Sequence, residues 1–217
     1  MSSGPPFRSF LFDLDGTLID HFTAIHRSYV HTLTTMGLPA PTPAQVRAAV
    51  GGGIENAIAK FVPPGRLDEA LGLYRPYWDR TMLDDVVLMP GAAALVRAVA
   101  AAGLPAGVIT NKVGPSSRLI CNRLQLTPYL RVVAGANDTP WLKPEPKFTA
   151  YALDQMGVGA EGGVLIGDSP FDIAAAHQGG LTAWCVATGT HTDPELRAAG
   201  ADAVFPDLRA LQAGLKL

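Results

Sequence analysis

Two carboxylates lie one residue apart near the start of the chain, in the segment Phe-Asp-Leu-Asp-Gly-Thr at residues 12–17. The run Ser9–Phe12 is short, apolar and rich in aromatic residues, and a glycine turn follows, which predicts a buried strand. Alternation along a strand would point Asp13 and Asp15 to the same side. Two anions held so close repel, so the spacing predicts either a cation between them or one protonated carboxyl group. Both arrangements serve phosphate chemistry.

Polar groups suited to the same chemistry follow three other apolar runs of the sequence. They are Thr110-Asn111-Lys112, Lys143-Pro144-Glu145-Pro146, and Gly167-Asp168-Ser169-Pro170-Phe171-Asp172. A site for phosphoryl transfer needs a nucleophile, a cation, hydrogen-bond donors for phosphate oxygens and an acid or base for the leaving group. The chain offers each of these at the end of a predicted strand.

The elements that would position these groups alternate along most of the chain. Short apolar runs at 106–110, 131–134, 163–166 and 181–186 predict buried strands, and the stretches 92–102, 116–124, 147–156 and 171–178 predict helices between them. This alternation predicts an α/β fold with a parallel sheet covered on both faces, a Rossmann-like three-layer α/β/α core. Such a sheet binds ligands at the carboxyl ends of its strands.

Residues 19–85 interrupt this alternation and predict an all-helical insert after the first strand. Helices are expected over 20–36, from Pro43, over 54–61 and over 67–81, with Pro76 a possible kink. Thr42, Pro43 and Gln45 have the spacing of a capping box with proline at the first helical position. We therefore expect a catalytic core of residues 1–18 and 86–217, and a small helical cap, or lid, of residues 19–85.

The ordered set of motifs resembles the haloacid dehalogenase superfamily over almost the whole chain. Asp13-Leu-Asp15-Gly-Thr17 is similar to its first motif, Thr110 to the second, Lys143 to the third, and Asp168 with Asp172 to the fourth. More narrowly, Thr110-Asn111-Lys112, Lys143-Pro144-Glu145-Pro146 and the helical insert are similar to phosphoglycolate phosphatase-like members. The resemblance implies a phosphatase that acts on a small phosphorylated metabolite.

The resemblance also implies roles for the acidic residues. Asp13 would attack phosphorus to form an aspartyl-phosphate, and Asp15 would protonate the leaving alkoxide and then deprotonate the attacking water. Mg²⁺ would be held by the carboxylates of Asp13 and Asp168, the backbone carbonyl of Asp15 and water molecules. Asp172 would support this shell, although its place three residues after Ser169 equally predicts a helix cap.

The remaining implied roles concern binding of the phosphate group. Thr110 and Asn111 would donate hydrogen bonds to phosphate oxygens, and Lys143 would offset negative charge. In the insert, Gly52 and Gly53 belong to a glycine-rich turn that predicts either a cradle of backbone donors for an anionic substrate or a flexible connection. Lys112 is left outside the predicted catalytic set, because its side chain can equally face solvent.

Other charged residues near the insert receive no role from the sequence. Arg27, Arg47 and Lys60 are typical of a solvated helix face, and His21 and His26 are typical of surface or internally satisfied residues. The three basic residues are alternative contacts for a carboxylate or second phosphate of the substrate, and the two histidines could reach the cleft entrance, but no pattern selects one.

Several other functions remain as alternatives. A sugar-phosphate mutase shares the first motif and the lid, although its fourth motif usually lacks the second aspartate found here as Asp172. Phosphonate hydrolysis would need a lid lysine, for which Lys60 is the insert's only candidate. A dehalogenase does not need an acid at the position of Asp15, and neither does a non-catalytic module that binds a phosphorylated ligand. The presence of Asp15 therefore disfavours both.

Composition excludes some broader classes. The net charge is −2, from 17 basic and 19 acidic residues without long runs of either sign, so we expect no binding to nucleic acid or to an anionic membrane. No apolar stretch predicts a membrane span or an export signal, and we expect a cytoplasmic protein. Cys121 and Cys185 are predicted to be reduced packing residues. Whether the protein is a monomer or a homodimer is left open.

Overall fold

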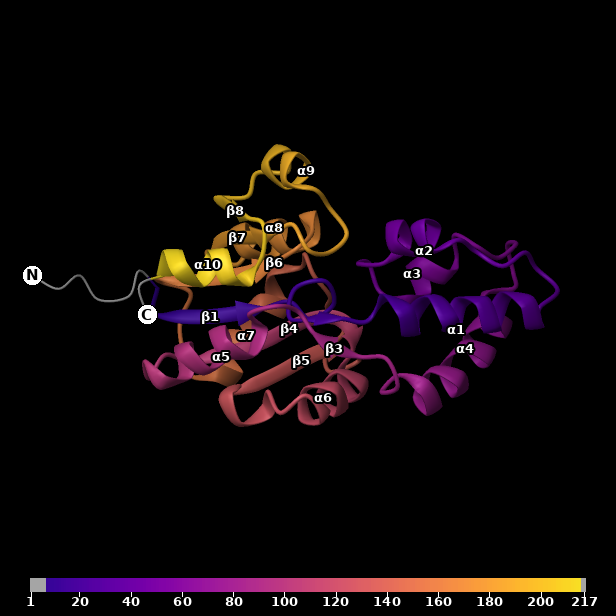
Figure 1. The fold of residues 1–217 in the computed structure, drawn as a ribbon, viewed down its shortest axis with the longest axis horizontal. Helices are drawn as coiled ribbons and strands as arrows, with labels where there is room; N and C mark the ends of the chain where they lie inside the picture. The colour runs from indigo at the N-terminus through magenta and orange to yellow at the C-terminus, as the bar shows by residue number, and fades with distance from the viewer. Residues whose placement is uncertain (1–6, 216–217) are drawn as a thin grey trace, which may run out of the picture.

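A parallel sheet forms the larger part of the molecule in the computed structural model, which describes residues 7–215. Its strands are β1 (Ser9–Phe12), β4 (Ala106–Val113), β5 (Val132–Ala136), β6 (Gly163–Gly167), β7 (Thr182–Val186) and β8 (Ala203–Phe205). They pair in parallel in the order β5-β4-β1-β6-β7-β8 (Figure 1). The chain passes from β1 to β4 on one side and later to β6 on the other. Strand β1 is therefore the point where the winding direction reverses, the usual ligand-binding place in such a sheet.

Helices cover both faces of this sheet. The helices of one face are α5 (Ala92–Ala101), α6 (Gly114–Arg123) and α10 (Leu208–Leu215), and those of the other are α7 (Pro146–Met156), α8 (Pro170–Gln178) and α9 (Asp193–Ala198). A short 3-10 turn, η1 (Thr127–Tyr129), lies between α6 and β5. The three-layer α/β/α class predicted from the alternation is confirmed.

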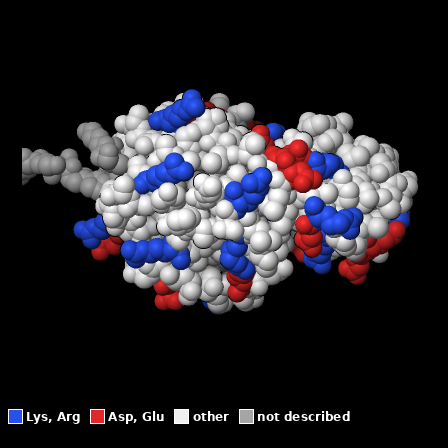
Figure 2. All heavy atoms as spheres, turned by 60° about the horizontal axis from the view of Figure 1, so that its bottom comes forward, with Lys and Arg blue, Asp and Glu red and all other residues white. Residues whose placement is uncertain are grey.

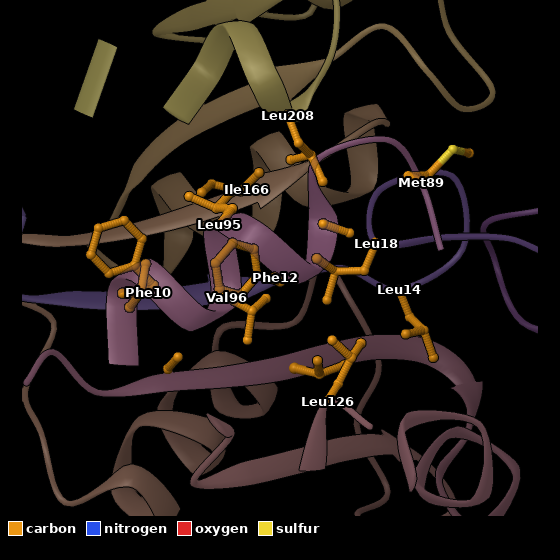
Figure 3. Close-up of a cluster of buried hydrophobic side chains, with 14 of the residues drawn as sticks. Phe10, Phe12, Leu14, Leu18, Met89, Leu95, Val96, Leu126, Ile166 and Leu208 are labelled. Atoms are coloured by element: carbon orange, nitrogen blue, oxygen red, sulfur yellow. The ribbon is translucent and has the colours of Figure 1, made fainter. Parts of the chain in front are cut away.

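Strand β1 is buried on both faces. Phe10 and Phe12 point into the cluster beneath α5 and α10, together with Leu95 and Leu208 (Figure 3), whereas Leu11 packs into the cluster beneath α7 and α8. Each fully buried side chain of this size contributes about 1.5–3 kcal/mol relative to an exposed one. The position of β1, and of the carboxylates that follow it, is therefore fixed from both sides.

The insert packs around a hydrophobic cluster of its own. Its helices are α1 (Phe22–Thr35), α2 (Pro43–Ala49), α3 (Ile54–Ile58) and α4 (Leu67–Thr81), and they lie beyond the end of the sheet (Figure 1). The capping box is present at α2, where Gln45 N donates to Thr42 Oγ1 and Thr42 N donates to Gln45 Oε1. Helix α4 has the predicted bounds and continues through Pro76.

The structure differs from the sequence prediction in several elements. Strands β2 (Ile19–Asp20) and β3 (Val87–Leu88) form a short antiparallel pair where the chain enters and leaves the insert, so the first residues of the predicted all-helical segment are extended. Helix α3 ends at Ile58 instead of Phe61, and β4 continues to Val113. Strand β8 and helices α9 and α10 were not predicted, because their apolar patterns are short.

Charged side chains are distributed over the surface. On the face shown in Figure 2, basic side chains are scattered, several of them directly beside acidic ones, and they do not merge into one patch of a single sign. None of the helices in the described part of the chain has the length and apolar character needed to cross a membrane. Cys121 and Cys185 are buried and free, and they pack on opposite faces of the sheet.

Candidate active site

The predicted site residues meet at the carboxyl ends of the central strands. Asp13 follows β1, Thr110 lies within β4, and Asp168 follows β6, the two strands that flank β1. All three line a cavity of about 450 Å³, which Asp15 and Lys143 also line. Its opposite wall comes from helices α1, α3 and α4 of the insert and from the loop before α3. The parallel sheet thus brings together residues that are up to 155 positions apart between Asp13 and Asp168.

Lys143 joins two buried carboxylates at the floor of this cavity. Its Nζ donates to Asp13 Oδ1 at 2.5 Å and to Asp172 Oδ1 at 2.6 Å, and its side chain is 3% exposed. Burial raises the pKa of Asp13, Lys143 lowers it, and nearby Asp172 raises it again, for a net value of about 6. Burial opposes the charge of Lys143, but the two carboxylates raise its pKa above the ordinary value, so the lysine stays protonated.

Asp172 has both of its carboxylate oxygens engaged. Oδ1 accepts from Lys143, and Oδ2 accepts from the backbone N–H groups of Asp168 and Ser169 and from Ser169 Oγ at 2.6 Å. The sequence predicted two roles for Asp172, a cap at the start of α8 and a support for the site. One arrangement of its carboxylate combines both. This residue holds Lys143, Ser169 and the backbone of Asp168 in place.

Asp168 is buried and is fixed by the loop after β7. Its Oδ2 accepts from Thr190 N at 2.7 Å and Thr190 Oγ1 at 2.9 Å, and Gly189 packs directly against the carboxylate. Burial raises the pKa of Asp168 well above its usual range, and the charges of Asp172 and Asp13 raise it further. In the described structure, three carboxylates here face one ammonium group, so negative charge is in excess.

This excess of buried negative charge fits a divalent cation. One oxygen each from Asp13, Asp168 and Asp172 lies within 4.8 Å of the others. Carboxylate oxygens are the ligands that hard cations such as Mg²⁺ prefer, and a cation would relieve the repulsion that raises the pKa values of Asp13 and Asp168. Both oxygens of Asp172 accept from close donors, whereas Asp168 Oδ1 accepts only from Thr17 Oγ1, at 3.4 Å, and the contact of Asp13 with Lys143 uses Oδ1 alone. Asp13 and Asp168 are therefore better suited than Asp172 to hold the cation.

Asp15 has its own cation, separate from Lys143. Lys112 Nζ lies 2.9 Å from Asp15 Oδ2 and 3.2 Å from Oδ1, and His21 Nδ1 lies 3.6 Å from Oδ1. Burial alone would raise the pKa of Asp15, but Lys112 and then His21 outweigh it and hold that pKa well below its usual range. The two carboxylates of the first motif thus have opposite pKa shifts, although they are only one residue apart.

Trp78 of the insert lies against the partners of Asp15. Lys112 Nζ is 4.4 Å from the centre of the Trp78 ring, and the His21 ring is 4.8 Å away. Trp78 Nε1 also donates to Ser116 Oγ at 3.4 Å, and His21 Nε2 is 2.6 Å from the carbonyl oxygen of Met82. Helix α4 therefore contacts the surroundings of Asp15 directly.

The Asn111 side chain joins the insert to the sheet edge. Its Nδ2 donates to Gly51 O at 2.9 Å and to Lys143 O at 3.0 Å, and its Oδ1 accepts from Lys143 N at 2.8 Å. The side-chain amide hydrogens that were predicted to donate to phosphate oxygens are thus engaged in these contacts. The role of the Asn111 side chain in phosphate binding stays a prediction.

The glycine-rich turn also lies against the core. Gly51 and Gly53 line the cavity, whereas a β-carbon on Gly52 would lie 3.5 Å from Cζ of the Phe171 ring. The phosphate cradle predicted for Gly52 and Gly53 stays a prediction, and of the two only Gly53 borders the cavity.

Sequence reasoning missed several residues of this site. Lys112 and His21 were set aside, yet His21 is buried and Lys112 is partly buried beside Asp15. The loop at Thr188-Gly189-Thr190 was not considered, although it follows strand β7 at the same edge of the sheet, where polar residues after an apolar run are a usable signal. The sequence carries no comparable signal for the cavity wall formed by Tyr29, Tyr74 and Trp78, because aromatic residues at helical spacing are equally typical of a hydrophobic core.

Comparisons with known proteins agree with this fold. A family model described as haloacid dehalogenase-like hydrolase matches residues 10–186. A phosphoglycolate phosphatase from Rhodospirillum rubrum is 31% identical over 94% of this chain and 89% of its own length. A phosphoglycolate phosphatase from Yersinia pestis is 32% identical over 80% of this chain and 78% of its own length.

Solved structures share the fold at lower identity. A putative phosphoglycolate phosphatase from Lactobacillus delbrueckii has a TM-score of 0.90 at 19% identity, with 96% of this chain and 98% of that chain covered. CbbY from Rhodobacter sphaeroides, solved in complex with phosphate, has a TM-score of 0.82 at 24% identity, with 97% and 100% covered.

Carboxylates gathered at the reversal point of a parallel sheet, together with these relatives, define the class: the protein is an enzyme that hydrolyses phosphoric monoesters. The match over residues 10–186 is specific enough to name the family, and the chain belongs to the haloacid dehalogenase-like hydrolases.

Proposed function

We propose that the protein is a Mg²⁺-dependent phosphatase that hydrolyses a small phosphomonoester through an aspartyl-phosphate on Asp13. The observation that carries the proposal is the contrast within the first motif. Asp13 lies against Lys143 in the group of carboxylates that could hold a metal ion, whereas Asp15 lies against Lys112 and is not a member of that group. One carboxylate is thus suited to attack phosphorus, and its neighbour is suited to exchange a proton.

The first step would form a bond between an Asp13 carboxylate oxygen and phosphorus while the bond from phosphorus to the ester oxygen breaks. Asp15 would give its proton to the departing oxygen. In the second step a water molecule attacks phosphorus, Asp15 takes a proton from that water, and the carboxylate of Asp13 leaves. Mg²⁺, held by Asp13 and Asp168, would neutralise charge on the phosphate oxygens.

The environment of Asp15 suits a group that must change protonation state. In the free enzyme, Lys112 and His21 favour its ionised form. A bound phosphate adds negative charge beside Asp15 and competes for Lys112, and both effects raise the pKa of a neighbouring carboxyl group. Substrate binding would therefore favour the protonated acid that the first step needs.

We further propose that residues 19–85 act as a lid over the sheet edge. The contacts of Asn111 with Gly51, of Arg47 Nη1 with Gly189 O and of Trp78 with Ser116 support this role, since each joins the insert to a loop of the core. A closed lid would exclude water from the reacting phosphate. The names of the relatives make 2-phosphoglycolate the first natural ester to test.

Phosphate release from 4-nitrophenyl phosphate with Mg²⁺ tests the chemistry without depending on the substrate's identity. Asp13→Asn should lower kcat by a factor on the order of 10⁶, as for removal of another enzyme's nucleophile. Asp154→Asn, at an exposed position of α7, is the matched control and should keep full activity. Retention of most activity by Asp13→Asn would rule out this nucleophile, and isomerisation without phosphate release would favour a mutase.

A further inference from the structure

The cavity has two chemically different halves. The half on the sheet edge carries Asp13, Asp168 and Lys143, which handle the phosphate group in the proposed function. The half on the insert is mostly apolar and aromatic: Ile25, Tyr29, Val50, Ile54, Ala57, Tyr74 and Trp78 line it. A pocket of about 450 Å³ is within the range that binds ring-containing ligands, and the two-carbon acid glycolate would leave the apolar half to water.

Tyr29 is the unusual polar group of this apolar half. Its residue is 1% exposed, yet its hydroxyl group has no hydrogen-bond partner among the residues that the structure describes. The rings of Phe61 and Tyr74 pack edge-on against the Tyr29 ring, with ring centroids 5.3 Å and 5.5 Å from its centroid. Burial raises the pKa of Tyr29, so the hydroxyl group stays neutral and can donate or accept. Buried hydroxyl groups normally have a partner, and a ligand is the natural one in a cavity wall.

The basic side chains that line the cavity are already paired. Lys143 contacts Asp13 and Asp172, and Lys112 contacts Asp15. On the insert, Arg75 Nη2 donates to Glu55 Oε1 at 2.6 Å. The other charged residue that the insert contributes to this cavity is Asp79, an acid. A second anionic group on the substrate would therefore have to displace a carboxylate from one of these cations, whereas an uncharged group displaces none.

We infer that the preferred substrate is the phosphate ester of an alcohol that carries an uncharged ring, with a ring hydroxyl or ring nitrogen that hydrogen-bonds to Tyr29. This inference rests on the proposed phosphatase function and specifies its substrate class. The ring fills the apolar half of the cavity, Tyr29 selects its polar substituent, and the phosphate lies at Asp13. Tyr29 is a specificity-determining residue and takes no part in the chemical steps.

Steady-state kinetics with matched esters test this assignment. The esters are 2-phosphoglycolate, benzyl phosphate and the three isomers of hydroxybenzyl phosphate, with 4-nitrophenyl phosphate as the general substrate. Benzyl phosphate should have a kcat/KM at least tenfold above that of 2-phosphoglycolate, because it fills the apolar half. At least one hydroxybenzyl isomer should exceed benzyl phosphate.

Tyr29→Phe removes only the hydroxyl group and keeps the ring contacts. It should raise KM for the best hydroxybenzyl ester about tenfold, the value of one hydrogen bond, and leave kcat and the benzyl ester unaffected. Its thermal midpoint of unfolding should be unchanged or higher, because no partner in the described structure is lost. Tyr77→Phe is the control: this tyrosine of the same insert stacks on His31 and does not line the cavity.

Three results would overturn the inference while the phosphatase function stands. They are a higher kcat/KM for 2-phosphoglycolate than for every ring ester, an equal effect of Tyr29→Phe on all esters, and a lower thermal midpoint for Tyr29→Phe. Absence of phosphate release from all esters, 4-nitrophenyl phosphate included, would overturn the proposed function and this inference with it.

Discussion

Gly189→Ala is a sharp test of the packing around Asp168. A β-carbon on Gly189 would lie 1.9 Å from Asp168 Oδ2 and 2.3 Å from its Cγ. Ordinary contact begins at 3.4 Å, so the two groups must separate by about 1.5 Å. The oxygen that would be displaced is the one that accepts from Thr190 N and Oγ1. A single methyl group therefore acts on a predicted metal ligand without changing the charge of the site.

The size of the effect follows from this displacement. A shift of about 1 Å at a catalytic group can lower the rate about 100-fold, so kcat/KM should fall by about that factor. Disturbed support of a metal ligand typically weakens metal binding by about 10- to 100-fold. Overpacking should also lower the free energy of unfolding by about 1–3 kcal/mol, which leaves a folded protein to measure.

The assay is titration of phosphate release against Mg²⁺ concentration, with a thermal melt of each variant. Gly72→Ala is the matched control, because a β-carbon on this glycine of helix α4 meets no described atom within 4 Å. That variant should keep full activity and gain up to about 1 kcal/mol of stability. If Gly189→Ala has the Mg²⁺ dependence and kcat/KM of the unaltered protein, the assignment of Asp168 as a metal ligand is refuted.

Two further predictions concern ion pairs. Lys112→Met removes the strongest influence that lowers the pKa of Asp15, so this pKa should rise. Hydrolysis of the aspartyl-phosphate needs ionised Asp15, so the acid limb of its pH profile should move to higher pH. An unchanged pH profile for decay of the intermediate in single-turnover experiments would contradict this prediction. Asp138→Asn removes a carboxylate that burial alone would make less acidic but whose pKa Arg118 and a backbone N–H lower below 3.8. The stabilisation from this partly exposed pair is present above pH 3.8 and is lost as pH falls through the folded-state pKa of Asp138. The free energy of unfolding of the variant, measured by urea titration at neutral pH, should therefore be about 1 kcal/mol lower. A difference in stability that persists unchanged at pH 2 would contradict the predicted direction of the pH dependence.

The sequence predicted the layers of the fold because their signals are local. The apolar run Ser9–Phe12 is buried on both faces of the sheet, and Thr42 with Gln45 forms the cap that its spacing indicates. The pair of β2 and β3 left no such signal, because two residues are too few for a periodic pattern. Their pairing depends on where the insert leaves and rejoins the sheet, which is a property of the tertiary structure.

The same distinction applies to the site. The sequence indicated Asp13 and Asp168 because each follows an apolar run that ends at one edge of a parallel sheet. Lys143 lies seven residues after the end of β5, and its place in the order of motifs indicated it. The position of Lys112 beside Asp15 depends instead on the extension of β4 to Val113 and on the Trp78 ring of a distant helix. No pattern within β4 alone distinguishes this lysine from a solvated one.

The central claim is that Asp13 carries the phosphate between the two chemical steps, and chemical trapping tests it most directly. Turnover with 4-nitrophenyl phosphate and Mg²⁺ is stopped in acid, the protein is reduced with borohydride, and its peptides are analysed by mass spectrometry. Reduction of an aspartyl-phosphate gives homoserine, which we predict at position 13 and, in the same peptide, not at position 15. Homoserine at position 15 would contradict the account. So would an unreduced Asp13 in enzyme that was stopped during steady turnover, when the phosphorylated intermediate has accumulated.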